Sequence, residues 1–156
     1  TRPADLRESA NLMTTSVTTR SPSETEAFAE SLATALRPPA TIALYGDLGS
    51  GKTCFVKGLV RGLGSEDLVT SPTFTLVHHY NGPAGRIRHF DLYRIRSNRE
   101  LDDLEMNGDP AEIVLIEWPE LMENDLPENA IRIKFEPVAE QTEERRITVE
   151  FDEKPE

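Results

Sequence analysis

One eight-residue stretch constrains the fold of this chain more than any other part of its sequence. Residues 46–53 match the phosphate-binding loop pattern G-x-x-x-x-G-K-[ST] at every specified position; they read Gly46, Asp47, Leu48, Gly49, Ser50, Gly51, Lys52, Thr53. The apolar run 41–45 in front of them has the length and composition of a buried strand. Behind them, apolar residues recur at helical spacing over 55–63, and Gly64 follows as a C-cap. Strand, glycine loop and helix in this order predict an α/β protein.

The residue types of this loop suit a phosphate ligand. Glycines let the backbone turn tightly, so that successive N–H groups face a phosphate oxygen, and the helix adds the positive end of its dipole. We expect Lys52 to reach the β- and γ-phosphates and the Thr53 hydroxyl to bind Mg²⁺. The alternative is a glycine-rich turn that merely caps a helix, but such a turn has no need of Lys and Thr at these positions.

Length and charge narrow the class of protein. With 156 residues a single domain is expected. We place this P-loop domain at 14–156, behind a tail, 1–13, that is expected to be disordered or poorly ordered. The 28 acidic against 17 basic residues give a net charge of −11, which disfavours direct binding of DNA or RNA. Any link to RNA is therefore expected to be indirect, through a partner.

The cysteine count and the hydropathy pattern indicate the compartment. Cys54 is the single cysteine, so the chain forms no intrachain disulfide and a reducing compartment is favoured. We expect Cys54 to be a small buried side chain rather than a reactive thiol. No apolar run approaches the ~18 residues of a membrane span, and the first twenty residues lack the apolar region of a secretory signal. A cytoplasmic protein without membrane contact is expected.

Patterns of apolar, capping and turn residues predict the remaining elements. Ser21, Pro22 and Glu24 have the spacing of an N-cap and first helical turn, and the helix is expected to end before the prolines 38–39. Two extended runs joined by a Gly/Pro turn predict an antiparallel hairpin. The expected elements are an edge strand at 14–20, the hairpin 69–80 and 86–93, a short helix at 98–104, a loop-like acidic segment from 121, and half-exposed strands at 131–135 and 147–151.

Two acids are candidates for the opposite wall of the site. The continuous apolar run 113–116 predicts a strand covered on both faces, as in a parallel sheet, and Glu117 follows directly at its C-terminal end. Asp91 lies in the second run of the hairpin. Groups that hold Mg²⁺ or orient an attacking oxygen lie at the carboxyl ends of strands beside such a loop. For each acid the alternative is a solvated surface position.

Five further residues carry weaker patterns. Thr73 follows the loop helix and is placed to contact a γ-phosphate or Mg²⁺, as switch loops do. Trp118 is either a wall of the nucleotide pocket or a core anchor. His78, His79 and His89 are expected to be packed or exposed strand residues, because no Cys/His spacing of a metal site is present.

Four motifs in order resemble those of the TsaE (YjeE) family. They are residues 46–53, Ser71-Pro72-Thr73-Phe74-Thr75-Leu76-Val77, His89-Phe90-Asp91-Leu92-Tyr93-Arg94 and Ile116-Glu117-Trp118-Pro119-Glu120, and the resemblance covers about residues 14–136. It implies a three-layer, P-loop NTPase-like α/β fold whose central sheet is mostly parallel with antiparallel hairpin additions. It also implies an ATPase, weak alone and stimulated by partners, that works with TsaD and TsaB in threonylcarbamoyladenosine modification of tRNA.

The resemblance also assigns roles by position. It implies that Lys52, Asp91 and Glu117 are catalytic, that Thr53 and Glu117 bind Mg²⁺, and that Asp91 acts either as a general base or as an acid near the metal. The nucleotide-binding residues that it implies are Gly46, Asp47, Gly49, Ser50, Gly51, Lys52, Thr53, Cys54, Thr73 and Trp118, with Thr25 near the adenine. Two departures are Cys54, in place of the usual second Thr or Ser, and the segment 104–111, which is shorter than usual and lacks the family's glycine-plus-aromatic pattern.

Two other functions remain open on the sequence alone. A small-molecule kinase of the P-loop class shares the loop and one acid, but no segment is long enough for both an arginine-bearing lid and an acceptor pocket. A nucleotide-gated assembly factor would bind ATP without essential hydrolysis. A regulatory GTPase is disfavoured because no N-K-x-D sequence occurs.

Overall fold

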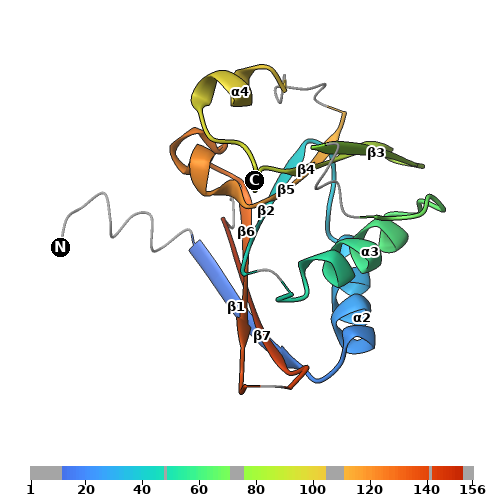
Figure 1. The fold of residues 1–156 in the computed structure, drawn as a ribbon. Helices are drawn as coiled ribbons and strands as arrows, with labels where there is room; N and C mark the ends of the chain where they lie inside the picture. Colours follow the sequence, from blue (N-terminus) through green and yellow to red (C-terminus); the bar gives the residue numbers. More distant parts are fainter. Residues whose placement is uncertain (1–11, 48, 71–75, 105–110, 141, 153–156) are drawn as a thin grey trace.

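A computed structural model describes residues 12–47, 49–70, 76–104, 111–140 and 142–152. Within these residues one sheet contains the strands β1 (Leu12–Thr19), β2 (Ala40–Tyr45), β3 (Val77–Gly82), β4 (Gly85–Asp91), β5 (Ile113–Glu117), β6 (Ile131–Pro137) and β7 (Arg145–Asp152). The helices are α2 (Pro22–Ala33), α3 (Lys52–Gly62), the short α4 (Asn98–Asp102) and the 3₁₀ helix η1 (Pro119–Asp125). Figure 1 shows their arrangement.

The sheet is parallel in its centre and antiparallel at both sides. Its strand order is β1-β7-β6-β2-β5-β4-β3. The pairs β6–β2, β2–β5 and β5–β4 are parallel, whereas β1–β7, β7–β6 and β4–β3 are antiparallel. The predicted parallel centre with antiparallel additions is therefore confirmed. The expected predominance of parallel pairing is not confirmed, because parallel and antiparallel pairings are equally frequent between the described strands.

Helical elements cover both faces of this sheet, as expected for three layers (Figure 1). Neighbouring residues of β2 point to opposite faces, because side chains alternate along a strand. Ile42 and Leu44 pack with α2 and α3 in the larger core cluster. Ala43 packs in the smaller cluster with apolar residues of α4 and η1, Leu101 and Met122 among them. Within the described residues the second helical layer is thin, since it consists of these two short elements.

Most predicted elements lie where the sequence places them, with three corrections. The first strand of the hairpin, expected at 69–80, is β3 and begins only at Val77. The Ser21 side chain caps α2 by accepting a hydrogen bond from the Glu24 amide. The edge strand β1 begins at Leu12, so Leu12 and Met13 belong to the sheet and not to the tail. The acidic segment expected to be loop-like instead forms η1, which starts at Pro119 as the pyrrolidine ring allows.

None of the helices in the described ranges combines the length and the hydrophobicity that crossing a membrane requires. The cytoplasmic location stays a prediction.

Helices α2 and α3 touch through their backbones. A Cβ atom at Gly58 would overlap the backbone of Glu26, and one at Gly62 would lie 2.6 Å from the Glu30 carbonyl oxygen. Gly58 and Gly62 lie one turn apart on α3, so both face α2. Because backbone atoms cannot withdraw as a flexible side chain can, the two helices are held at a fixed separation.

We predict that Gly58→Ala lowers the free energy of unfolding by about 1–3 kcal/mol, because overpacking forces the backbones apart. In an exposed helix interior the same substitution would stabilise by roughly 0.5–1 kcal/mol, so the sign of the effect reports the contact. Urea unfolding at equilibrium measures it, with Lys57→Ala, on the exposed face of the same helix, as the matched control. Stabilisation by Gly58→Ala would contradict the prediction.

Candidate functional site

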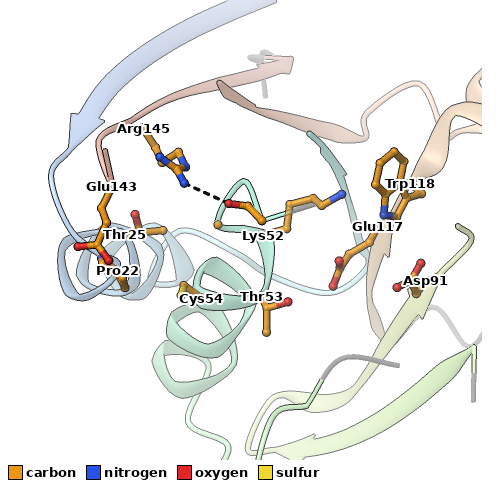
Figure 2. Close-up of a pocket in the computed structure, with 12 residues that line it drawn as sticks. Pro22, Thr25, Lys52, Thr53, Cys54, Asp91, Glu117, Trp118, Glu143 and Arg145 are labelled. Atoms are coloured by element: carbon orange, nitrogen blue, oxygen red, sulfur yellow. Dashed lines mark hydrogen bonds between the residues drawn. The ribbon is translucent and has the colours of Figure 1, made fainter. Parts of the chain in front are cut away.

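A pocket of about 340 Å³ lies where the N-terminus of α3 faces the carboxyl ends of β4 and β5. Figure 2 shows the residues that line it: Pro22, Thr25, Gly49, Gly51, Lys52, Thr53, Cys54, Asp91, Glu117, Trp118, Glu143 and Arg145. The carboxyl ends of parallel strands are the usual position of binding sites in open α/β sheets. The pocket therefore brings the glycine loop and both predicted acids into one site.

Two glycines of the loop, Gly49 and Gly51, line the pocket where the loop leads into α3. Gly49 and Gly51 have φ angles of 76° and 106°, a left-handed region that side chains rarely adopt. Gly51 is the N-cap of α3, and no side chain caps this helix. The first N–H groups of a helix have no intrahelical acceptor, so this N-terminus is suited to an anion.

The Ser50 hydroxyl is a buried polar group of the loop. Ser50 is only 6 % exposed, and its Oγ has no hydrogen-bond partner among the described residues. A buried polar group without a partner costs free energy of folding. A ligand that accepts from this hydroxyl would remove that cost.

Lys52 is a buried cation at the start of α3. Its side chain is directed toward Trp118 (Figure 2), and Nζ lies 3.7 Å from the centroid of the Trp118 ring. The same Nζ donates a hydrogen bond to the Gly46 carbonyl. Burial lowers the pKa of Lys52, while the charges of Glu117 and Asp91 act in the opposite direction. A poorly hydrated ammonium of this kind gains more from a bound anion than an exposed one does.

Glu117 and Asp91 lie opposite one another at the ends of two adjacent parallel strands. Each is only 3 % exposed, so the alternative of solvated surface acids is wrong. The Asp91 Oδ1 accepts a hydrogen bond of 2.9 Å from the Tyr93 amide. Both acids line the same pocket as Thr53. The pocket thus places two carboxylates across from the helix that carries Lys52.

Trp118 combines the two roles that the sequence left open. It lines the pocket, and it also packs against the core cluster on the thinner side of the sheet. Its ring centroid lies 4.8 Å from that of Tyr93. Its backbone is left-handed, with φ 57°, at the step from β5 into η1. The turn into η1 therefore orients the ring toward Lys52.

Two functional candidates escaped the sequence analysis. His89, expected to be an ordinary strand residue, is fully buried, and its Nε2 lies 2.6 Å from the Glu117 Oε2. The available signal was its spacing: His89 and Asp91 are two residues apart in one strand, so they share a face of the sheet. Arg145 gave no local signal, because its contacts with the glycine loop span about a hundred residues of the chain.

Arg145, at the start of β7, binds the carbonyl side of the glycine loop (Figure 2). Its Nε donates to the Ser50 carbonyl and its Nη2 to the Gly49 carbonyl, each at 3.1 Å. When the amides of a loop face an anion, some of its carbonyls must point away from the anion. The Arg145 guanidinium donates hydrogen bonds to two such carbonyls. Arg145 thereby links β7 to the glycine loop.

The structure locates some of the remaining predicted site residues but not all of them. Thr25 lines the pocket and is buried, with its Oγ1 2.7 Å from the Thr19 Oγ1. Cys54 is half-buried and lines the pocket, so the expectation of a buried side chain is wrong. Thr73 lies outside the described residues, as do 105–110 of the shortened segment. No group of three or more His, Cys, Asp and Glu side chains in the described ranges is arranged to hold a metal ion.

The fold and the pocket define a mixed α/β protein in which a glycine loop at a helix N-terminus faces two buried carboxylates. The chain belongs to the TsaE family, because the family model described as "Threonylcarbamoyl adenosine biosynthesis protein TsaE" matches residues 19–147. The resemblance of the four motifs to this family is thereby confirmed.

Individual relatives agree with this assignment. The chain is 37 % identical over 130 residues to the Bacillus subtilis tRNA threonylcarbamoyladenosine biosynthesis protein TsaE, an alignment that covers 83 % of this chain and 81 % of the relative. It is 38 % identical over 116 residues to the protein of that name from Treponema pallidum, with coverages of 73 % and 84 %. The crystal structure of Bacillus subtilis YdiB superposes with a TM-score of 0.70 at 32 % identity, over 90 % of this chain and 87 % of that one.

We predict that Arg145→Ala loosens the glycine loop, because two carbonyls lose a charged donor. The free energy of unfolding should fall by roughly 1.5–3 kcal/mol, the range for hydrogen bonds to charged groups. Amide hydrogen exchange at residues 49–51 should accelerate beyond what this loss of global stability explains. Arg146→Ala, next in the chain and exposed, serves as control, and equal protection of the loop in both variants would refute the role of Arg145.

Proposed function

We propose that this chain is a Mg²⁺-dependent, ATP-binding and ATP-hydrolysing subunit with a P-loop NTPase-like fold. In this proposal it supports threonylcarbamoyl transfer to adenosine in tRNA together with the TsaD and TsaB proteins. One observation carries the proposal: the uncapped N-terminus of α3, with the buried Lys52, faces the buried Glu117 across one pocket.

The residues of the loop fit a triphosphate. Left-handed glycines and the free helix N-terminus provide amide donors for phosphate oxygens. The unpartnered Ser50 hydroxyl supplies one more donor. Lys52, which contacts the Gly46 carbonyl and the Trp118 ring, would exchange these contacts for a stronger one with phosphate oxygens.

The residues also fit a metal ion that takes most of its ligands from the nucleotide phosphates and from water. In our proposal the Thr53 hydroxyl and the Glu117 carboxylate are its protein ligands. Mg²⁺ in nucleotide sites keeps several waters and takes only one or two carboxylates, the phosphates supplying the rest, which agrees with the lack of a dense ligand cluster among the described residues. Bound there, Mg²⁺ would neutralise the charge that develops on the transferred phosphoryl group.

Asp91 is the second acid of the proposed reaction. Its Oδ1 accepts from the Tyr93 amide, which fixes the carboxylate beside Glu117. We assign it the orientation of the attacking water and the acceptance of its proton. Asp91 is only 3 % exposed, so neighbouring protein groups and not bulk water determine its position.

Names of relatives and surface charge support the proposed pathway and partners. The Bacillus subtilis and Treponema pallidum relatives are both named for tRNA threonylcarbamoyladenosine biosynthesis. A net charge of −11 repels a phosphate backbone, so we propose that tRNA is reached only through TsaD and TsaB, in the cytoplasm, without DNA or membrane contact.

We predict that Lys52→Ala and Glu117→Gln each lower ATP turnover at least about 100-fold, the scale of losing one preorganised charged group in a closed site. Turnover is measured with purified chain, alone and with TsaD and TsaB, which should stimulate the unmodified protein. Lys57→Ala, an exposed lysine of the same helix, is the control and should retain full turnover.

The same assay separates the alternative functions. Fast turnover without partners, with transfer to a small acceptor, would replace the proposal with a kinase. If Asp91→Asn abolished hydrolysis but left ATP binding and tRNA modification by the complex intact, an assembly factor gated by nucleotide would be the correct function. Neither result would change the location of the pocket.

A further inference from the structure

A row of hydrogen bonds runs through the sheet from β3 to Glu117. The Glu117 Oε2 lies 2.6 Å from the His89 Nε2, and the His89 Nδ1 lies 3.1 Å from the Tyr80 hydroxyl. That hydroxyl is also 3.3 Å from the Thr70 carbonyl oxygen, to which it can donate. The row thus crosses three adjacent strands, β3, β4 and β5, and ends at the pocket.

The side chains of this row are buried in the core, where apolar side chains would avoid the free-energy cost of burying polar groups. His89 is 0 % exposed and Tyr80 is 2 % exposed. Tyr80 belongs to the larger core cluster, together with Ile87 and Leu115 of the neighbouring strands. Burying an imidazole and a phenol costs free energy unless each polar atom is paired, so core packing alone gives no reason for a histidine at this position.

The donor in the His89–Glu117 contact follows from the chemistry of the acid. We assign the proton of this contact to the His89 Nε2, because a metal-binding carboxylate is ionised and can then only accept hydrogen bonds. Among the described residues this is the only side-chain hydrogen bond of Glu117. It occupies Oε2 and leaves Oε1 for the pocket. The Tyr80 hydroxyl, whose pKa burial raises to about 12, keeps its single proton at neutral pH. It donates that proton either to the Thr70 carbonyl or to the His89 Nδ1, and it contacts the ring in both cases.

We propose that His89 is a positioning residue for Glu117: it holds one carboxylate oxygen so that the other is presented to Mg²⁺ and nucleotide, and Tyr80 fixes the orientation of the ring. This inference rests on the proposed function. Hydrogen bonds to ligating groups restrict their rotation, and losing such a bond typically weakens metal binding 10- to 100-fold.

Nucleotide binding without turnover tests this role. Trp118 is the single tryptophan and contacts Lys52, so its fluorescence reports ATP binding in the pocket. In the first titration, ATP is added to the chain in excess EDTA. In the second, Mg²⁺ is added at a fixed ATP concentration without EDTA. We predict that His89→Leu raises the Mg²⁺ concentration for half-maximal effect about 10- to 100-fold, while ATP affinity in EDTA stays unchanged.

Rescue distinguishes positioning from packing. His89→Gln keeps an amide donor that can reach the Glu117 carboxylate, so it should recover most of the Mg²⁺ response although its shape differs from imidazole. Tyr80→Phe removes one hydroxyl only and should shift the Mg²⁺ response in the same direction, by less. A packing role would instead lower the Tm and weaken ATP binding equally with and without Mg²⁺.

A matched control and the response of the unmodified chain complete the design. His79→Leu alters an exposed histidine of β3 and should leave both titrations unchanged. An unshifted Mg²⁺ response in His89→Leu, or in Tyr80→Phe if His89→Leu does not fold, overturns the inference alone. If the unmodified chain binds ATP with no effect of Mg²⁺, the proposed metal role fails together with the inference.

Discussion

The parallel pairing of β2 with β5 is the constraint on which the site depends. Its register sets Leu44 opposite Glu117, so the strand that leads into the glycine loop ends beside the strand that ends in the acid. The next pairing, β5 with β4, adds Asp91 in the same row. Because side chains alternate along strands, a shift by one residue would turn each acid to the opposite face. Apolar packing on both faces, by Leu44 and Ile116 among others, fixes this register.

Charge is concentrated in a place where it is poorly hydrated. Lys52 is 4 % exposed, and its neighbours across the pocket are two buried carboxylates. Such groups are retained only when they are paired or hydrogen-bonded. Here each has a named partner: the Gly46 carbonyl for Lys52, the Tyr93 amide for Asp91 and the imidazole of His89 for Glu117. The sheet therefore provides rigid support for groups that would otherwise be neutralised or exposed.

Sequence patterns predicted the parts of the site that depend on residues close together in the chain. The strand, loop and helix around Lys52 follow from local periodicity and glycine spacing, and Glu117 follows from an apolar run that ends in an acid. His89 and Arg145 were missed for a physical reason: their partners lie on other strands, and only the strand order brings them together. The 3₁₀ form of η1 was also missed, since acidic residues and prolines are equally common in loops. Roles in catalysis and metal binding stay predictions.

The backbone contact between α2 and α3 has a consequence for the pocket. Both helices present their N-terminal ends to it, through Thr25 and Lys52, and the close approach at Gly58 prevents them from sliding past each other. One wall is therefore stiff and moves as a single body. Adjustment to ligands of different size falls to the opposite wall, where the half-exposed Trp118 ring lies at the turn into η1 and not on either helix.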